Sequence, residues 1–346
     1  MPSEGQSATV SATLETAVQE ANHARYRPGQ TAGHYESFFL RANHPQRPLA
    51  FWIRYTVFSP DGRPEDAIGE LWAVYFDGET AGHVAAKSEV SLAACSFGAS
   101  AFGVRVADAV LRPGGAQGRA ASAGHAISWD MTFGGSAPPL FLLPLEFYAP
   151  EIPRAKSLVP LPMAVFHGTL EVDGRPIEVS GWTGSQNHNW GPRHTDHYAW
   201  GQVAGFDTHP ESFLEIATAR FRVGDSWTPF ATPLVLRHRG QEFPLNAPAQ
   251  AAVAKAAFGY FHWDFASETD AIAIAGTVRA PKAAFVGLTY YNPPGGEKHC
   301  LNTKIAYCEL HLTHKHTGET EVLSTRNRAA FEILTDDRDH GVPISV

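Results

Sequence analysis

The feature that most limits the fold of this chain is a series of short apolar runs that end in turn sequences. Residues 50–58, for example, are rich in aromatic and β-branched side chains and are followed by Ser-Pro-Asp-Gly. The clearest hairpin joins residues 167–172 to residues 177–182 through a short connection that contains Asp173 and Gly174. Comparable runs recur at a spacing of roughly 8–12 residues, which is typical of barrels and sandwiches. The pattern predicts an all-β, antiparallel fold.

The same rhythm divides the chain into a leader and two halves. Residues 1–28 read as a polar leader with a short helix over Ala12–Ala24, which Pro28 and Gly29 end. Residues 29–192 and 193–346 each contain enough strand runs for one barrel, although no sequence repeat relates the two halves. An alanine-rich helix is predicted over Ala249–Phe258.

Composition and charge exclude several classes of protein. Hydrophobic residues make up 44% of the chain, which is enough for a sizeable core. A formal net charge of −8 argues against a nucleic-acid partner, because such proteins need a basic face. The sequence has no apolar run long enough to span a membrane, no secretory signal and only three cysteines. These features favour a cytoplasmic protein.

Motifs for common cofactors are absent from the sequence. It has no dinucleotide-binding glycine fingerprint, no phosphate-binding loop, no nucleophile elbow and no His-Glu-x-x-His zinc motif. Histidines 188, 194, 197 and 209 and the run 311–316 invite a metal site, but glycine- and proline-rich loops often expose histidines to solvent. We therefore expect neither a cofactor nor a metal.

Three segments carry a resemblance to a known superfamily. They are residues 35–42 with 50–55 and 71–74, residues 181–191 (GWTGSQNHNWG) leading into 198–201, and residues 290–295 with 300–306. Together they resemble the carotenoid 1,2-hydratase (hydroxyneurosporene synthase) and AttH-like superfamily over most of residues 30–335. The resemblance implies two tandem lipocalin-like barrels and an apolar ligand, such as an isoprenoid, a polyene or a polyketide. Fold alone does not identify the substrate.

The His-Asn-Trp segment is the first candidate for catalysis. His188 and Trp190 are two residues apart, so on a strand both side chains project from the same face. One can move a proton while the π-face of the other stabilises a carbocation. Alternatively, His188 and Asn187 satisfy buried backbone groups and Trp190 fills one end of a barrel.

The resemblance implies a second motif that works with this pair. In carotenoid hydratases the His-x-Trp pair is accompanied by Tyr-x-Asp, whose counterpart here is Phe213-Leu214-Glu215. Glu215 can act as proton donor if burial raises its pKa. Phe213 lacks the phenolic hydroxyl, so the site has one polar group fewer to orient a water molecule. This difference favours isomerisation or cyclisation over hydration. Glu215 could equally pair with Arg220 or Arg222, or face solvent.

Further residues are expected to bind the ligand, because pockets are mostly apolar with a few polar groups. They are Asn187, Phe213, Trp200, Gln202, Arg54, Trp72 and Trp52. Core packing is the alternative for the aromatic members. Arg54 lies inside an apolar run, where it either holds a ligand carboxylate or forms an ion pair with Glu70 or another acid.

These observations leave three functions open. The first is a cofactor-independent isomerase, cyclase or hydratase that acts on a hydrophobic substrate by proton-initiated alkene chemistry. The second is a lipid or isoprenoid carrier that uses the same cavity, and the third is a structural barrel filled by its own side chains. The expected partner is a hydrophobic small molecule. Peripheral contact with a membrane is compatible with such a ligand.

Overall fold

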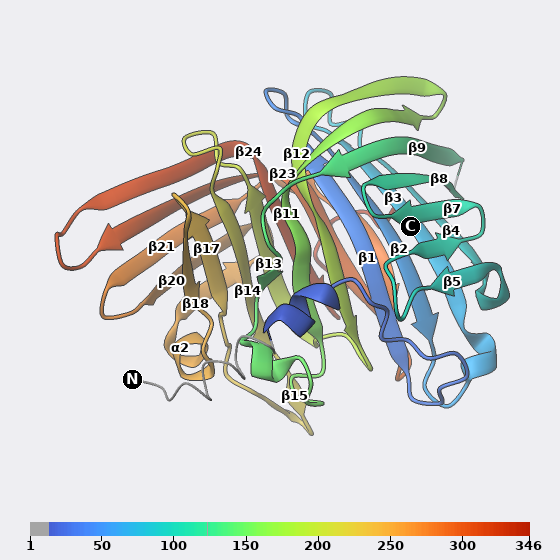
Figure 1. Ribbon diagram of the computed structural model, residues 1–346, viewed down its shortest axis with the longest axis horizontal. Coiled ribbons are helices and arrows are strands. Elements are labelled where there is room, and N and C mark those ends of the chain that lie inside the picture. The colour runs from blue at the N-terminus through green and yellow to red at the C-terminus, as the bar shows by residue number, and fades with distance from the viewer. Residues whose placement is uncertain (1–13, 123) are drawn as a thin grey trace.

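The computed structural model describes residues 14–122 and 124–346, and over this part the chain is almost entirely β-structure in two large antiparallel sheets (Figure 1). The first sheet has the spatial order β4-β3-β2-β1-β12-β11-β9-β8-β7-β6-β5, and β10 pairs with β11. Its strands are β1 His34–Asn43, β2 Leu49–Ser59, β3 Ile68–Asp77, β4 Val84–Ser91, β5 Cys95–Phe97, β6 Val104–Val106, β7 Ala109–Arg112, β8 Gly115–Ser122, β9 His125–Gly134, β10 Leu140–Phe141, β11 Lys156–Val172 and β12 Arg175–Gly191.

The second sheet has the order β18-β17-β14-β13-β24-β23-β21-β20-β19, with β22 on β23. Its strands are β13 His197–Ala204, β14 Phe213–Arg220, β17 Leu234–His238, β18 Gln241–Leu245, β19 Lys255–Gly259, β20 His262–Glu268, β21 Ile272–Arg279, β22 Val286–Tyr291, β23 Glu297–His314 and β24 Thr320–Thr335. A small ribbon pairs β15 Arg222–Val223 with β16 Ser226–Trp227. Short helices are α2 Pro248–Val253 and the 3-10 turns η1 Pro64–Asp66, η2 Leu92–Ala94, η3 Leu145–Phe147 and η4 Lys282–Ala284.

The first sheet curls on itself into a nearly closed barrel, because β4 at one end packs against β8 and β9 near the other. The second sheet follows it in the chain and lies beside it in space (Figure 1). Residues 14–19 form the helix near the N-terminus, whereas residues 12 and 13 lie outside the described part. The predicted all-β class, with two consecutive antiparallel units after a short helix, is confirmed.

The predicted hairpin of β11 and β12 forms as expected. Asp173 and Gly174 connect Val172 to Arg175, and both have positive φ, +50° and +79°. A turn with two left-handed residues matches the right-handed twist of the flanking strands. The end of β12 then pairs with β1, with Tyr35 opposite Gly191, so the His-Asn-Trp segment lies in the middle of the first sheet.

Both predicted helices are too long. The N-terminal helix ends at residue 19, well before Pro28. The alanine-rich helix stops at Val253 because Ala254 is extended, and Lys255–Gly259 becomes β19. Ala256 and Phe258 pair across β20 with Phe265 and Trp263, so tertiary pairing overrides the helix propensity of alanine.

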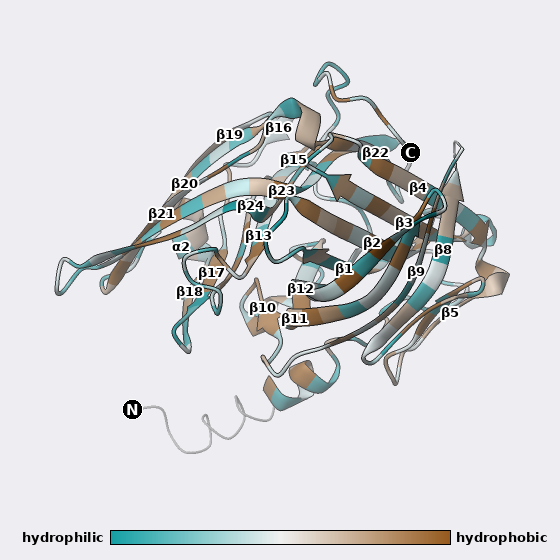
Figure 2. Ribbon diagram, turned by 90° about the horizontal axis from the view of Figure 1, so that it is seen from above, coloured by the Kyte–Doolittle hydropathy of each residue, from teal (hydrophilic) through white to brown (hydrophobic). Residues whose placement is uncertain are grey.

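The two sheets share a hydrophobic core. Trp52, Trp72 and Phe76 of the first sheet belong to the same buried cluster as Trp200 and Trp263 of the second. Figure 2 shows hydrophobic stretches on β1, β2 and β3, and these strands contact β23. The barrel has a separate core of its own. The change of sheet occurs between Gly191 and His197, and the domain limits at residues 192 and 193 stay a prediction.

Within the described residues, no helix combines the length and the apolar composition needed to cross a membrane.

Candidate functional site

A cavity of about 350 Å³ lies where the two sheets meet, and we call it the junction pocket. One wall comes from β1 and β2 of the barrel and includes Tyr35, Trp52 and Arg54. The opposite wall comes from the second sheet and includes Trp200 on β13. Residues 142–155, which join β10 to β11, contribute much of the apolar lining. The pocket is mostly apolar with a few polar groups, as in small-molecule sites.

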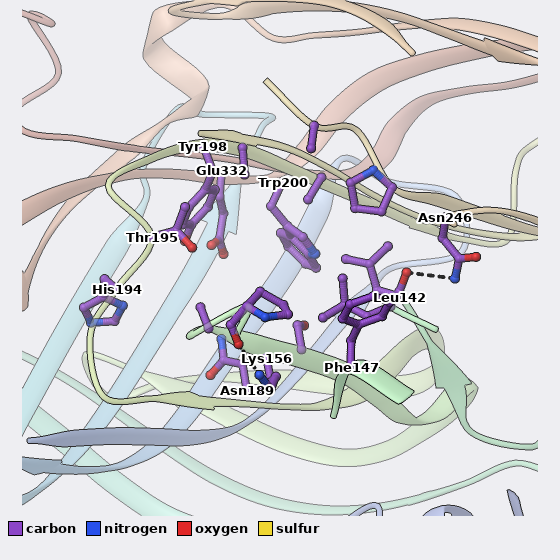
Figure 3. Close-up of a pocket in the computed structure, with 18 of the residues that line it drawn as sticks. Leu142, Phe147, Lys156, Asn189, His194, Thr195, Tyr198, Trp200, Asn246 and Glu332 are labelled. Atoms are coloured by element: carbon purple, nitrogen blue, oxygen red, sulfur yellow. Dashed lines mark hydrogen bonds between the residues drawn. The ribbon is translucent and has the colours of Figure 1, made fainter. Parts of the chain in front are cut away.

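The two ends of the junction pocket are lined by different side chains, with Asn189 and Lys156 between them (Figure 3). Figure 3 shows His194, Thr195, Tyr198 and Glu332 at one end and Leu142, Phe147 and Asn246 at the other, with Trp200 between them. Asn246 donates a hydrogen bond to the backbone oxygen of Leu142 at 3.0 Å. A ligand in this pocket would therefore have different surroundings at its two ends.

Glu332 is the only carboxylate of the described residues that lines the junction pocket. It lies on β24, opposite Trp200 on β13 and Asn302 on β23. Its Oε1 accepts hydrogen bonds from Lys304 Nζ at 2.7 Å and from Asn302 Nδ2 at 2.9 Å. Burial lowers the pKa of Lys304, and the contact with Glu332 opposes this shift. The carboxylate is thus oriented by two donors at the polar end of an apolar cavity.

Arg54 also faces the junction pocket, and it is 4% exposed. Its Nε donates to Ser37 Oγ at 2.7 Å, and its guanidinium lies over the ring of Tyr290 at 4.4 Å. The ion pair with Glu70, one of the two possibilities for this arginine, does not form, because Glu70 bonds Lys87 at 2.8 Å.

His194 is a pocket residue that the sequence suggested either as a metal ligand or, with preference, as a solvent-exposed loop histidine. The second expectation is wrong, because the side chain is buried. Its ring stacks on Tyr35, with centroids 3.9 Å apart, and on Tyr290 at 5.5 Å. Burial holds the pKa of His194 well below its usual value, and the charges of Arg54 and Lys298 lower it further. The imidazole is therefore neutral at pH 7. The signal that could have found it is its position between the two sheets, directly after β12.

Glu215 lies behind Trp200 and does not line the junction pocket. Its two carboxyl oxygens accept hydrogen bonds from Trp200 Nε1 at 2.8 Å and from Gln202 Nε2 at 2.7 Å. Burial raises the pKa of Glu215 to about 7, although both hydrogen bonds and Arg41 act in the opposite direction. The expected neutral or readily protonated carboxyl is present, but the indole of Trp200 separates it from the cavity.

Asn187 and Gln202 form a buried polar network between the sheets instead of lining the junction pocket. Gln202 donates to Asn187 Oδ1 at 2.8 Å and accepts from Arg41 Nε at 2.8 Å and Ser185 Oγ at 2.6 Å. Each member satisfies part of another's hydrogen-bonding capacity, as a buried polar network must. Their ligand-binding role stays a prediction.

His188 and Trp190 share a face of β12, with ring centroids 4.6 Å apart, but this face does not line the junction pocket. Asn189, between them, lines it instead. The Nδ1 of His188 lies 2.8 Å from the backbone oxygen of Ala21, and its Nε2 lies 2.7 Å from Glu36 Oε1. These contacts match the structural alternative for His188, so the structure does not bring the two residues together with Glu215 in one cavity.

The other predicted ligand-binding residues are divided. Trp52 and Trp200 line the junction pocket. Trp72 does not; it packs against Trp52 and Tyr290, with centroids 6.5 and 5.6 Å away. Phe213 is buried in a small separate cluster beside Leu140, Val159, Ala204 and Val235.

One group of described residues has the composition of a metal site, namely His209, His238 and Glu321. Glu321 Oε2 lies 3.3 Å from His238 Nε2 and 3.9 Å from His209 Nε2. The same oxygen also forms an ion pair with Arg239 at 2.8 Å. An ion pair between Arg239 and Glu321 is therefore an alternative account of this cluster.

The chain was compared with protein families, with curated proteins and with solved structures. No protein-family model matches the chain. Two uncharacterized proteins of Mycobacterium tuberculosis, from strains CDC 1551 and H37Rv, are each 25% identical to it over 319 residues, which cover 90% of this chain and 92% of theirs.

Three solved structures resemble the chain over 90% of its length. They are a protein of Nitrosomonas europaea assigned as AttH (14% identity, 98% of that chain, TM-score 0.55), kievitone hydratase from Nectria haematococca (10%, 91%, 0.53) and CghA (12%, 93%, 0.56). The chain has the AttH-like lipocalin fold. At these identities the likeness establishes the fold alone.

Proposed function

We propose that this protein is a cofactor-independent enzyme that binds a hydrophobic small molecule in the junction pocket and isomerises, cyclises or hydrates it by proton transfer. The observation that carries the proposal is the carboxylate of Glu332 at the polar end of an apolar cavity. One structure of the same fold is named a hydratase, which supports a reaction of this kind. An isoprenoid or polyketide substrate and a cytoplasmic location belong to the same proposal.

Glu332 takes the role of the acid–base group because it touches the cavity, whereas Glu215 does not. In an isomerisation, its carboxylate removes a proton from one carbon of the substrate and returns it to another, so no external reactant is consumed. Lys304 and Asn302 hold the carboxylate in place during both steps. Trp200, directly opposite Glu332, presents its ring to the same space.

Glu215 is a positioning residue in this proposal. It holds the indole nitrogen of Trp200 at 2.8 Å and so fixes the plane of the ring against the cavity. The π-face of a tryptophan stabilises a nearby positive charge by about 1–2 kcal/mol when water is excluded. Trp200 therefore takes the role of stabilising positive charge that the sequence suggested for Trp190.

A carrier function is the alternative, and one observation favours it. Glu332 is already paired with Lys304, so the ion pair is satisfied without a substrate. A carrier would bind the same ligand and return it unchanged.

Deuterium exchange separates the two functions even when the product has not been identified. The protein is purified from its native cells, the bound small molecule is extracted with organic solvent, and its mass is measured. The ligand is then incubated with fresh protein in D₂O. An enzyme incorporates deuterium into carbon positions or converts the ligand, and Glu332→Gln abolishes this. A wild-type protein that binds the ligand but leaves it unlabelled and unchanged is a carrier.

Two further variants keep this experiment interpretable. Glu309→Gln removes a carboxyl on β23 that does not line the junction pocket, and it should exchange like the wild type. Glu332→Gln combined with Lys304→Met removes both charges, so an inactive but folded protein remains available if the single variant leaves Lys304 unpaired and unfolds.

A further inference from the structure

We propose that the ligand of the junction pocket is an amphipathic carboxylic acid whose carboxylate is bound by Arg54. This inference rests on the proposed small-molecule function and specifies its substrate class. The apolar body of the acid would lie toward Leu142 and Phe147, and its carboxylate would lie at the opposite, polar end.

Arg54 is a buried cation without a carboxylate partner. Among the described residues, no Asp or Glu oxygen lies within 4.0 Å of its guanidinium, although the side chain is 4% exposed. Its hydrogen bond to a described residue runs from Nε to Ser37, which leaves the two terminal amino groups for the pocket. Buried charges are normally paired, since an isolated one is costly to remove from water.

The nearby acids contact other cations instead of Arg54. Glu70 forms an ion pair with Lys87 at 2.8 Å, which Glu89 also contacts at 2.6 Å, and Glu332 forms one with Lys304 at 2.7 Å. His194, stacked beside Tyr290, is neutral because burial lowers its pKa. Against the effect of burial, Glu70 and Glu332 act on Arg54 from a distance and help to raise its pKa, but neither contacts its guanidinium. The terminal amino groups of Arg54 therefore remain available to a ligand carboxylate in the pocket.

The geometry of Arg54 suits a carboxylate in particular. The guanidinium lies over Tyr290 at 4.4 Å and 5.9 Å from the ring of Trp52, and the Ser37 contact fixes its third nitrogen. A guanidinium held in this way offers its terminal nitrogens as a fork that matches the two oxygens of a carboxylate. A cavity of about 350 Å³ accommodates one small apolar body, which favours a single-chain or terpenoid acid over a two-chain phospholipid.

The test compares ligands that differ only in the head group. Dodecanoic acid, methyl dodecanoate and dodecan-1-ol are titrated into the full-length protein at pH 8, and binding is followed by tryptophan fluorescence. We expect the acid to bind about 10-fold or more tightly than the ester and the alcohol. Arg54→Met should remove this preference while leaving ester binding unchanged, and Arg54→Lys should keep part of it.

Lys156→Met is the matched control, because Lys156 is the other cation that lines the junction pocket. Its Nζ already donates to the backbone oxygens of Pro150 and Pro153, so the preference for the acid should persist. Loss of the preference in Lys156→Met but not in Arg54→Met would overturn the assignment. Equal binding of the acid and the ester by the wild type would also overturn it.

Thermal unfolding of the ligand-free protein gives a second readout. Arg54→Met loses the hydrogen bond to Ser37 and the attraction of Glu70 and Glu332, but it also removes a charge from the protein interior. These effects oppose each other, so the variant should unfold within a few degrees of the wild type. A large drop would make Arg54 a structural residue and would contradict the proposal. The binding test is independent of turnover: a preference for the acid without deuterium exchange leaves this inference standing and refutes the proposed enzyme.

Discussion

At the scale of single residues, the two carboxyl groups nearest the indole of Trp200 have different surroundings. Glu332 touches the junction pocket and is bound by an ammonium group, whereas Glu215 is shielded behind the ring and accepts only neutral donors. Burial without a bound cation is the reason why the pKa of Glu215 rises to about 7. These different surroundings suit the different roles in the proposal, in which Glu332 transfers the proton and Glu215 positions Trp200.

The raised pKa of Glu215 predicts a pH-dependent stability. Above pH 4.5 the unfolded chain loses this proton while the folded protein keeps it, so the free energy of unfolding should fall as pH rises from about 4.5 to 7. The loss attributable to Glu215 should reach roughly 3 kcal/mol. Thermal unfolding at pH 5, 6, 7 and 8 measures it.

Glu215→Gln should lack this component, because an amide does not titrate in this range. The variant loses one hydrogen bond, since its amide group must face either Trp200 or Gln202, which are both donors. Its unfolding temperature should therefore be lower than that of the wild type at pH 5 and should approach it at pH 8. Parallel pH profiles for the two proteins would contradict a raised pKa.

The position of the site could be predicted from the sequence only in part. Alternation along a strand correctly placed His188 and Trp190 on one face, but it cannot say which face meets the cavity. That choice depends on the pairing of β1 with β12 and on Glu36, which holds His188 toward the N-terminal segment. The same limit applies to Glu332, because its approach to Trp200 requires β24 to pair with β13.

At the scale of elements, one buried carboxylate attaches the N-terminal segment to the barrel. Glu36 on β1 accepts hydrogen bonds from the backbone amides of Arg25 and Tyr26 and from His188. Burial alone would raise the pKa of Glu36, but the bonds from His188 and His34 outweigh it and lower the value to about 2. Three separate parts of the chain therefore meet at this side chain.

Glu36→Gln should detach this segment. An amide in place of the carboxylate accepts fewer of the buried hydrogen bonds from Arg25, Tyr26 and His188, and we expect a loss of about 3 kcal/mol. Hydrogen exchange should accelerate at the amides of Arg25 and Tyr26 before the rest of the sheet is affected. In the wild type, the contribution of Glu36 is complete above pH 4.5 and is lost as pH falls toward 2. Unchanged exchange at these two amides would refute the anchoring role.

The seam between β1 and β12 depends on a glycine. A Cβ atom at Gly184 would collide with the backbone oxygen of Arg41 and with Ala42 on the neighbouring strand. Gly184→Ala should therefore destabilise the protein by about 2–3 kcal/mol, as measured by denaturant unfolding. Gly134→Ala is the control, because a Cβ there meets nothing within 4 Å. Equal stabilities of the two variants would show that the strands separate easily.

The ends of strands and helices were predictable where turn residues determine them. They were not predictable where pairing with a neighbouring strand determines them. Asp173 and Gly174 end β11 through their own backbone preferences. By contrast, β19 forms from an alanine-rich sequence because β20 offers a free edge beside it. Local propensity contains no information about such an edge, so the predicted helix continued too far.

At the scale of the whole molecule, the two sheets are joined by more than surface contact. They share one buried aromatic cluster and the polar network around Gln202, in which Arg41 of the barrel donates across the junction at 2.8 Å. Separating the sheets would expose Trp52 and Phe76, which are both about 1% exposed or less, together with a buried guanidinium. Such an interface stabilises each sheet through the other.

We therefore expect the protein to unfold in a single cooperative transition. Differential scanning calorimetry should give one peak whose calorimetric and van't Hoff enthalpies agree. Gln202→Ala should lower the temperature of that peak without splitting it, since the network holds both sheets. Two resolved peaks would mean that the barrel and the second sheet are independent folding units.

The division of the junction pocket between the sheets has a consequence for how such proteins diversify. The guanidinium on β2, the segment of residues 142–155 and the carboxylate on β24 lie far apart in the sequence, so mutations can alter one without disturbing another. A descendant could exchange its head-group preference through β2, or its tolerance for chain length through residues 142–155, and still keep the reactive group of β24. Affinity and chemistry would then be inherited as separate traits within one polypeptide.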